Sequence, residues 1–393
     1  MPTAVLDLDF VNLPSAITGL DGYSRALILI RYRGVPVGKA LVPVAGGRID
    51  RRELPKLLLE GAGWPLFERW LYDYLDWDAS GKERSVHGPA TIVICTRDRA
   101  EELRHCLDAI ERLPDGGQEI LVVDNAPKTD ATFRLVLGYA RVKYVREDRP
   151  GLDVARNRAL HEAKNEIVAF MDDDAIPDPN WLRALLRNFD DPYVLCVTGL
   201  TMPLELETDG QEWFERHSTF CRGFRRKVFD SSTHNPLATG PIGSGTNMAF
   251  RKDVIKHVGF FDEALDGGTP TCSGGDTEMF SRILMRGYRI VYDPTALNWH
   301  RHRRARDEVR KALYGYGVGV YAFLTRSVLR EGEFTAPKIA WNWFRYQQLR
   351  ALARSLLRRP GAVPLDLLVA ELCGCFIGPF AYLSSWMRLR SRN

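Results

Sequence analysis

From Thr91 onward, short β-rich runs alternate with helical patterns, and this alternation limits the fold more than any other feature of the chain. The β-rich runs are TIVICT (91–96), EILVVD (119–124), VKYVRE (142–147) and EIVAFMD (166–172). Helical patterns such as AEELRHCLDAIERL and LDVARNRALHEA lie between several of them. Strands that alternate with helices predict an α/β fold, a doubly wound and mainly parallel sheet that is flanked by helices.

Polar residues follow three of these predicted strands directly. The first run is followed by RDR (97–99), the second ends in Asp124, and the fourth leads into an aspartate triplet, residues 172–174. In open α/β sheets, ligands bind beyond the carboxyl ends of the strands. We therefore expect these three strand ends to meet at one crevice.

The triplet in FMDDDAIPDP is either a solvated acidic loop or a cation site. On an extended segment side chains alternate, so Asp172 and Asp174 face one way and Asp173 faces the other. Two carboxylates on one side suit a hard divalent cation that keeps open positions for substrate phosphates. The plainer alternative is a surface loop, since acidic loops are common. Asp178, which precedes Pro179, is predicted to cap the N-terminus of the next helix.

The two ends of the chain differ from this central segment. Residues 24–44 predict two strands around a turn at Arg33-Gly34, and a helical pattern follows up to about Leu75. The polar stretch 76–89, with Gly and Pro, predicts a linker. We therefore expect three parts: a small N-terminal α+β module with its linker (1–88), an α/β domain (89–304) and a helical C-terminal extension (305–393).

Basic charge is concentrated in the C-terminal extension. Residues 301–393 contain 17 Lys and Arg but 6 Asp and Glu, whereas the whole chain has a net charge of +4. Such an excess favours an anionic partner. The stretch 372–387 is uncharged and precedes RLRSR, but it is short and interrupted by Gly and Pro, so no spanning helix is predicted. Either the extension lies on an anionic membrane surface, or its helices pack on the central domain.

The seven cysteines include no CxxC pair, which argues against a disulfide framework and a zinc site. A reducing compartment fits this pattern. The N-terminus, MPTAVLDLDFVN, lacks the features of a signal peptide. We expect a cytoplasmic protein, peripheral on the inner face of the cytoplasmic membrane if the extension binds there, and no nucleic-acid partner.

Seven segments carry a family resemblance. They occur in the order IVICTRDR, EILVVDNAPKTD, GLDVARNRAL, AFMDDDAIPDPNWL, GTNMAFRKDVIKHVGFFDEAL, GGDTEMFSRILMRGYRIVYDP and NWHRH. Each is moderately specific, but the ordered set resembles the motif series of family 2 glycosyltransferases, which have the GT-A fold and invert the anomeric centre. The resemblance covers roughly residues 89–304 and leaves both ends of the chain unexplained.

The resemblance implies a metal site and a donor site. Asp172 and Asp174 match the DxD motif, which holds Mn²⁺ or Mg²⁺ against the donor diphosphate, and His300 is placed at the same metal, with His302 as its alternative. Arg156, on the ARN motif, either contacts the donor or pairs with the acidic crevice. The candidates for donor contact are Thr96, Arg97, Asp124, Arg156, Asn157, Asp172 and Asp173.

Asp276 matches the acid that serves as general base in inverting members. The family usually has Glu-Asp at this position, whereas Gly275 stands here in place of the glutamate. A structural alternative is that Asp276 only caps the helical pattern that begins beside it. Glu278 is the reserve candidate for the base.

Together these features predict a metal-dependent inverting glycosyltransferase that moves a sugar from a nucleotide sugar to an acceptor hydroxyl. UDP-sugars are favoured by the resemblance alone, and the acceptor could be a saccharide, as in polysaccharide biosynthesis, a lipid-linked sugar or a small molecule. Two other classes stay open. A sugar-nucleotide nucleotidyltransferase would also use paired aspartates on an α/β sheet, and a non-catalytic, membrane-peripheral binding protein would need neither Asp174 nor Asp276.

Overall fold

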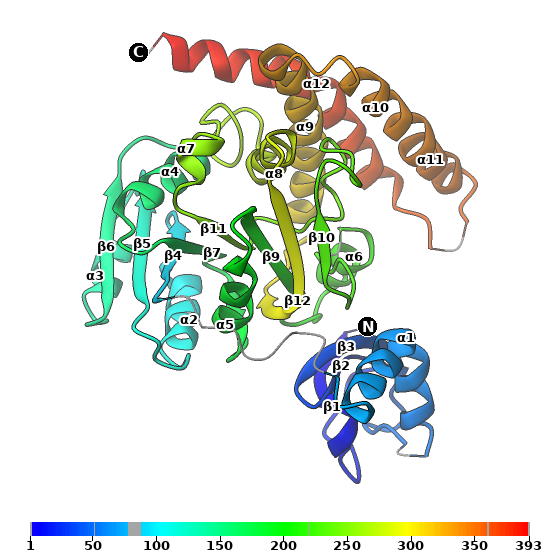
Figure 1. Ribbon diagram of the computed structural model, residues 1–393. Helices are drawn as coiled ribbons and strands as arrows, with labels where there is room; N and C mark the ends of the chain where they lie inside the picture. Colours follow the sequence, from blue (N-terminus) through cyan, green and yellow to red (C-terminus); the bar gives the residue numbers. More distant parts are fainter. Residues whose placement is uncertain (1, 51, 78–87, 219, 360, 392–393) are drawn as a thin grey trace.

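The protein has three parts that are arranged along one axis. The computed structural model describes residues 2–50, 52–77, 88–218, 220–359 and 361–391. Figure 1 shows a small N-terminal module and a set of C-terminal helices at opposite ends of a central α/β body. Most of the predicted linker, residues 78–87, lies outside the described part of the chain. The exact limits of the three predicted parts stay a prediction.

The N-terminal module is a three-stranded sheet that is covered by one helix. The turn between its last two strands was predicted at Arg33-Gly34, and both residues have positive φ, 49° and 78°, as a tight hairpin requires. An additional first strand pairs in parallel with the second strand. The elements are β1 (Thr3–Asp9), η1 (Phe10–Asn12), β2 (Arg25–Tyr32), β3 (Val35–Pro43) and α1 (Leu54–Tyr74).

Strand β2 is buried on both faces, and this joins the module to the body. Ile28 points into the core beneath α1. Leu27 and Leu29 point the other way and pack in one apolar cluster with Leu200 and Leu297 of the central body. Alternating side chains of one strand therefore belong to two different cores.

The central body is one sheet of nine strands, within the described residues, in the order β10-β12-β9-β11-β7-β4-β5-β6, with β8 paired to β12. The half from β7 to β6 is parallel throughout, as the sequence predicts. The strands are β4 (Thr91–Thr96), β5 (Glu119–Asn125), β6 (Val142–Glu147), β7 (Ile167–Asp172), β8 (Ala175–Pro177), β9 (Val194–Pro203), β10 (Lys227–Phe229), β11 (Asn247–Arg251) and β12 (Arg289–His300).

Helices cover both faces of this sheet and bury alternating residues of its strands. Ile92 and Ile94 of β4 belong to the core on one face, and Val93 belongs to the core on the other. The helices of the body are α2 (Ala100–Ile110), α3 (Ala131–Val136), α4 (Leu152–Glu162), α5 (Trp181–Leu186), η2 (Arg187–Asp190), α6 (Asp209–Ser218), α7 (Val254–His257) and α8 (Gly275–Met285). The predicted α/β class with a mainly parallel central sheet is confirmed.

The C-terminal extension is helical, as predicted, and its two long helices cross at glycines. A Cβ atom at Gly374 would lie 2.2 Å from the carbonyl oxygen of Tyr314, and one at Gly317 would lie 2.2 Å from that of Glu371. Only glycine permits so close an approach of two backbones. The elements are α9 (Arg306–Glu331), α10 (Ala336–Trp343), the π-helical turn η3 (Phe344–Gln348), α11 (Leu349–Leu356) and α12 (Leu365–Arg390).

The sequence underestimated the length of α12. Its glycines were taken as interruptions, but they serve the contact with α9, and the helix continues through Pro379 for 26 residues. By length and composition, α12 is the one helix within the described residues that could cross a membrane. In its most apolar window 39% of the residues are buried.

The predicted cap at Asp178 is wrong in one respect. Helix α5 begins only at Trp181, and its N-cap position is occupied by Asn180. One oxygen of Asp178 accepts a hydrogen bond from the backbone N–H of Asn180 at 3.0 Å, in the turn before the helix. The other oxygen forms a 2.6 Å ion pair with Arg31 of the N-terminal module, a partner that local sequence does not reveal.

Candidate active site

Two strand ends bring the acidic triplet and a histidine together. Strand β7 ends at Asp172, and the chain turns back into β8, which pairs antiparallel with the end of β12 so that Ala175 lies opposite His300. The backbone N–H of Arg301 donates to the carbonyl of Asp174 at 3.0 Å. One ligand atom each of Asp172, Asp174 and His300 lies within 4.8 Å of the other two. The predicted pairing of Asp172 with Asp174 on one side is thus the arrangement observed.

This cluster suits a divalent cation. Oδ1 of Asp174 is buried and has no hydrogen-bond partner among the described residues, although Nε2 of His300 is only 3.1 Å away. Adjacent ligands of an octahedral ion with bonds of about 2.1 Å lie about 3 Å apart. Carboxylate oxygens and an imidazole nitrogen are also donors that Mn²⁺ accepts. The residues therefore fit the ion that was expected, with Asp172, Asp174 and His300 as its holders.

Asp173 points away from this cluster, as the alternation of side chains predicts. Its carboxylate accepts hydrogen bonds from the hydroxyl of Thr96 at 2.6 Å and from the guanidinium of Arg99 at 2.6 Å. Arg99 also donates to Asp174 at 2.8 Å. Arg99 was noticed in the sequence only as part of a polar strand end, yet it neutralises two of the three aspartates.

Burial and the neighbouring charges separate the pKa values of the three aspartates. Burial and the charge of Asp174 raise the pKa of Asp172. Burial also raises the pKa of Asp173 to about 7, against the opposing effect of Arg99. For Asp174 the nearby His300 and Arg99 outweigh burial and lower the pKa. Asp174 is thus held as a carboxylate, the form that binds a cation.

His300 is connected to the N-terminal module by hydrogen bonds. Its Nδ1 lies 3.2 Å from Nδ1 of His302, and Nε2 of His302 lies 3.2 Å from Oε2 of Glu215 in α6. The other oxygen of Glu215 accepts from Nζ of Lys39 in β3 at 2.6 Å. Burial lowers the pKa of His302, whereas for His300 the charge of Asp174 outweighs burial and raises the pKa. His302, which was predicted as an alternative ligand, instead contacts the ring of His300 from the side away from Asp174.

Asp276 is held at the start of α8 rather than before it. Gly274 occupies the N-cap position and Asp276 is the second helical residue, so the capping alternative is not the one observed. Its Oδ2 accepts from the backbone N–H of Gly245 at 2.6 Å, and its Oδ1 accepts from the N–H of Thr277 at 2.7 Å. Asp276 is half-buried. Its Oδ1 also accepts from the hydroxyl of Thr277 at 3.3 Å, whereas Oδ2, with one hydrogen bond, keeps a lone pair for a further bond.

The departure at Gly275 has a steric reason. A Cβ atom at this position would lie 2.0 Å from Oδ2 of Asp153. The carboxyl group of Asp153, at the start of α4, is fully buried in the space that a side chain at residue 275 would need. Its own partner is Arg156, whose Nη1 donates to Oδ1 at 2.9 Å.

Arg156 lies within the acidic crevice. It is buried and pairs with Asp153 at 2.9 Å and Asp266 at 2.7 Å. Burial opposes its charge, but these two carboxylates, and then Asp276 and Asp172, raise the pKa of Arg156. The ion pair that was predicted as its structural alternative is thus present, and Arg156 is electrostatically coupled to both ends of the crevice. Contact with a donor stays a prediction.

Asp124 is the next-to-last residue of β5, and Thr96 of the neighbouring strand β4 lies directly opposite it in the sheet. Oδ2 of Asp124 accepts from the hydroxyl of Tyr144 at 2.9 Å, whereas Oδ1 is buried without a hydrogen-bond partner among the described residues. Burial raises the pKa of Asp124. Arg97, which directly follows Thr96, is exposed. Asp124 and Thr96 thus lie side by side, as the convergence of strand ends predicts.

Comparison with known proteins identifies the domain that carries these residues. Residues 91–259 match the family model of glycosyl transferase family 2. This segment of the chain is thus similar to that family. The match includes the strand ends of β4, β5 and β7 and ends before Asp276 and His300. The part of the α/β body that contains the DxD turn is therefore the part that is similar to glycosyl transferase family 2.

The relatives are distant. The pre-mycofactocin glycosyltransferase of Mycobacterium tuberculosis (strain CDC 1551 / Oshkosh) is 29% identical over 259 residues, 64% of this chain and 50% of the relative. Glycosyltransferase AglE of Haloferax volcanii is 25% identical over 58% of this chain and 72% of its own. The solved mannosyltransferase PcManGT from Pyrobaculum calidifontis, in complex with GDP-Man and Mn²⁺, has 19% identity and a TM-score of 0.47 over 83% of this chain and 82% of that one. The chain thus spans half the length of the mycobacterial relative.

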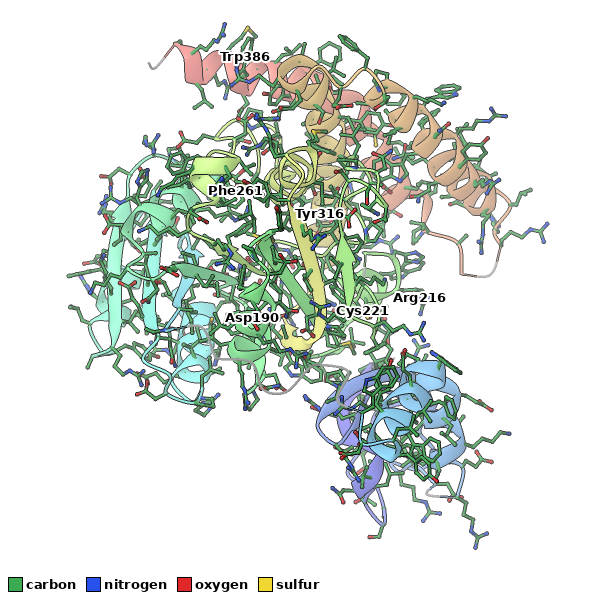
Figure 2. All side chains as sticks on the ribbon, viewed as in Figure 1. Asp190, Arg216, Cys221, Phe261, Tyr316 and Trp386 are labelled. Atoms are coloured by element: carbon green, nitrogen blue, oxygen red, sulfur yellow. The ribbon has the colours of Figure 1, made fainter. Side chains whose placement is uncertain are left out.

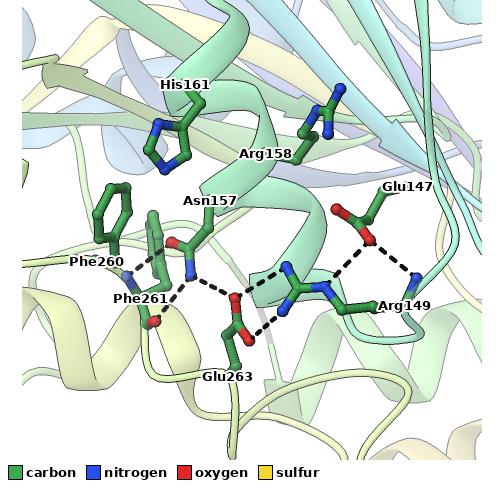
Figure 3. A pocket seen from close by; sticks show the side chains of 8 residues that line it. All are labelled: Glu147, Arg149, Asn157, Arg158, His161, Phe260, Phe261 and Glu263. Carbon is green, nitrogen blue, oxygen red and sulfur yellow. Dashed lines mark hydrogen bonds and ion pairs between the residues drawn. The ribbon is translucent and has the colours of Figure 1, made fainter. Parts of the chain in front are cut away.

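Two of the predicted site residues have other partners. Asn157 lines a separate hollow of about 310 Å³, and Figure 3 shows it beside Phe261 and Glu263. Its amide exchanges hydrogen bonds of 2.9 and 3.0 Å with the backbone of Phe261, so a donor contact by Asn157 stays a prediction without support from this geometry. Glu278, the reserve base, is fully buried and ion-paired with Arg326 at 2.9 Å.

Tyr316 of α9 also lies near the candidate active site, and no sequence pattern indicated it. Its ring packs 6.3 Å from that of Phe214 in α6, between centroids, and Figure 2 labels it at the junction of the C-terminal helices with the body. Burial, opposed by Arg303 and reinforced by Asp276 and Asp172, raises its pKa. The signal was absent because Tyr316 belongs to the extension, outside the family motifs.

Proposed function

We propose that this protein is a metal-dependent inverting glycosyltransferase that uses a nucleotide-sugar donor. The observation that carries the proposal is the cluster of Asp172, Asp174 and His300 at the strand ends of a family 2 domain. Its one unpartnered buried oxygen, on Asp174, faces the histidine nitrogen. A buried carboxylate oxygen without a hydrogen bond is costly unless a cation or ligand completes the site.

The donor is proposed to lie across the strand ends of β4, β5 and β7. Asp124 offers its free oxygen to the nucleoside, and Thr96 and Arg97 stand beside it. The diphosphate would reach the acidic cluster, where Asp172, Asp174 and His300 hold Mn²⁺ or Mg²⁺. When bound, such an ion offsets the negative charge that develops on the leaving nucleoside diphosphate. UDP is the nucleotide favoured by the family resemblance.

Asp276 is the proposed general base. It removes the proton from the acceptor hydroxyl while that oxygen forms a bond to the anomeric carbon of the donor. The bond between the anomeric carbon and the phosphate oxygen breaks at the same time, and its electron pair leaves with the nucleoside diphosphate. Attack from the face opposite the leaving group inverts the anomeric centre. The N–H groups of Gly245 and Thr277 fix the Asp276 carboxylate for this task.

We further propose that the C-terminal extension meets an anionic membrane surface, with the protein cytoplasmic and peripheral. Side chains of α12 that do not pack on α9 are exposed, including Phe376 at 66% and Phe380 at 70%. Leu356 and Leu357 at the end of α11 are 62% and 67% exposed. Apolar side chains flanked by arginines are typical of helices that lie in a lipid headgroup layer. The arginines are Arg345, Arg350, Arg354, Arg358, Arg359, Arg388 and Arg390.

The same proposal gives only the class of the acceptor: a saccharide, a lipid-linked sugar or a small molecule with a free hydroxyl.

The reaction itself is tested by product analysis. Purified protein with Mn²⁺ is incubated with a panel of nucleotide sugars and acceptors, and NMR reports the anomeric configuration of the product. The proposal expects nucleoside diphosphate release and an inverted linkage. Diphosphate release from a nucleoside triphosphate would instead indicate a nucleotidyltransferase, and a retained linkage would remove Asp276 as base.

A further inference from the structure

The N-terminal module has no role in the family resemblance, yet it makes several polar contacts with the body, and three ion pairs among them come from its strands β2 and β3. Arg31 pairs with Asp178 at 2.6 Å, Arg25 pairs with Glu212 at 2.6 Å, and Lys39 pairs with Glu215 at 2.6 Å. Of these three ion pairs, the one of Lys39 continues inward to a residue of the metal cluster. The pair of Arg25 reaches the same helix, α6, one turn earlier and does not contact His302.

Hydrogen bonds connect Lys39, Glu215, His302 and His300 in series. The direction of each bond follows from the groups involved. A carboxylate only accepts, so Nε2–H of His302 donates to Glu215. A neutral His302 then has an unprotonated Nδ1, and the contact of 3.2 Å requires that Nδ1–H of His300 donates to it. The remaining nitrogen of His300, Nε2, is the one that faces Oδ1 of Asp174 at 3.1 Å. This series of hydrogen bonds thus determines which nitrogen of His300 faces the metal cluster.

Burial and ring packing also hold the side chains of this hydrogen-bonded series rigidly. The side chain of His302 is 1% exposed, that of Glu215 is 10% exposed and that of His300 is 9% exposed. Phe214 packs against the ring of His302 with centroids 4.7 Å apart, and Phe220 meets His300 edge-on at 5.2 Å. For Glu215, the hydrogen bond from His302 and the charge of Lys39 outweigh burial and lower the pKa. Glu215 is therefore an anion at neutral pH, and this is the form that accepts hydrogen bonds from both Lys39 and His302.

We propose that Lys39, Glu215 and His302 are positioning residues for the metal ligand His300, so that the N-terminal module completes the metal site of the transferase domain. Lys39 fixes Glu215, Glu215 fixes the ring of His302, and His302 accepts the Nδ1–H of His300. A metal-binding histidine usually donates its second ring N–H to such a partner, which orients the ring and raises its basicity. This inference rests on the metal site of the proposed function.

The test measures Mn²⁺ affinity of the full chain by titration calorimetry, without donor or acceptor. Lys39→Met is expected to weaken binding by a factor of about 3 to 10, and Glu215→Gln by about tenfold, at the low end of the effect of such outer partners. Lys39→Arg keeps the cation and should bind nearly as well as the wild type. Arg25→Met removes a matched ion pair between the module and α6, and it should leave the affinity unchanged.

Equal affinities of Lys39→Met and Arg25→Met, with both variants folded by circular dichroism, would overturn the inference. If Lys39→Met does not fold, Glu215→Gln decides the question in the same comparison with Arg25→Met. A wild type that binds no Mn²⁺ would be a failure of the proposed function itself. If the wild type binds Mn²⁺ and the variants Lys39→Met and Glu215→Gln bind it as tightly as the wild type does, the inference alone fails.

Discussion

At the scale of single residues, the three aspartates of the acidic triplet have two different surroundings. Alternation along an extended segment was enough to predict that Asp172 and Asp174 lie on one side and that Asp173 points away. Arg99 could not be recognised as their counterion, because it lies 74 residues before Asp173 in the chain. Only the parallel pairing of β4 with β7 brings the two residues together. The sequence thus predicts the ligands better than the groups that hold them in place.

Removal of the counterion should destabilise the metal-free protein. In Arg99→Met, two nearly buried carboxylates lose a charged donor, which is expected to lower the free energy of unfolding by about 1–3 kcal/mol. Added Mn²⁺ should raise the melting temperature of Arg99→Met more than that of the wild type, because the cation replaces the missing positive charge. Thermal melts with and without Mn²⁺ check this. Arg104→Met, an exposed site on the same helix, is the control; an equal Mn²⁺ effect in Arg99→Met and wild type would refute the prediction.

Gly275 is the second residue-scale case, since the sequence showed its departure from the family pattern without the cause. The cause is the carboxyl group of Asp153, which a Cβ at residue 275 would approach to 2.0 Å. Gly275→Ala should therefore cost about 1–3 kcal/mol of stability through overpacking. Urea denaturation measures the change. Gly240→Ala, at an exposed glycine with no atom within 4 Å of the added carbon, should be nearly neutral, and equal losses at the two sites would contradict this explanation.

At the scale of elements, the central strands were predicted closely because a continuous apolar run between turn signals has few other solutions. Helix α12 was harder, since a glycine in a sequence indicates either a break or a close contact. The contact is settled by α9, whose own glycines lie opposite. The N-cap positions of α5 and α8 were each displaced by two residues from the predicted ones, Asn180 instead of Asp178 and Gly274 instead of Asp276, because capping depends on backbone geometry that side-chain type does not fix.

The crossing of α9 and α12 predicts a sharp difference between neighbouring positions. Gly374→Val places a side chain against the carbonyl oxygen of Tyr314, 2.2 Å from the new Cβ, and should detach α12 or cost about 3 kcal/mol or more, beyond ordinary overpacking. Cys373→Val makes a β-branched residue at the adjacent exposed position and should change stability by less than about 0.5 kcal/mol. Limited proteolysis of the C-terminal helices, together with thermal melts, reports the outcome. Equal resistance of the two variants would show that the helices do not cross as described.

At the scale of the whole molecule, the sequence predicted three parts but not how they depend on one another. The module joins the body through β2, whose two faces serve different cores, and through ion pairs whose partners lie far apart in the chain. The C-terminal helices lie at the opposite end of the body (Figure 1), and they leave apolar side chains and arginines exposed. Such contacts between distant segments leave no local pattern, so only the folded chain reveals them.

The uncovered end predicts binding to anionic lipid. The wild type should sediment with vesicles that contain equal parts of phosphatidylglycerol and phosphatidylcholine, and less so as salt rises, because screening weakens the attraction of arginine to head groups. The double change Phe376→Ser and Phe380→Ser should reduce the bound fraction. Trp64→Ser, at a side chain that is 57% exposed at the other end of the molecule, should not. No sedimentation at low salt, or an equal effect of Trp64→Ser, would contradict the membrane proposal.

The central claim is that Asp174 holds the metal through which a nucleotide sugar binds, while Asp276 acts only on the acceptor. The measurement that tests it most directly is the thermal shift of the protein with a panel of nucleotide diphosphates and nucleotide sugars, with and without Mn²⁺. We predict a metal-dependent shift that Asp174→Ala abolishes and that Asp276→Asn retains. A shift that persists unchanged in Asp174→Ala would contradict the account.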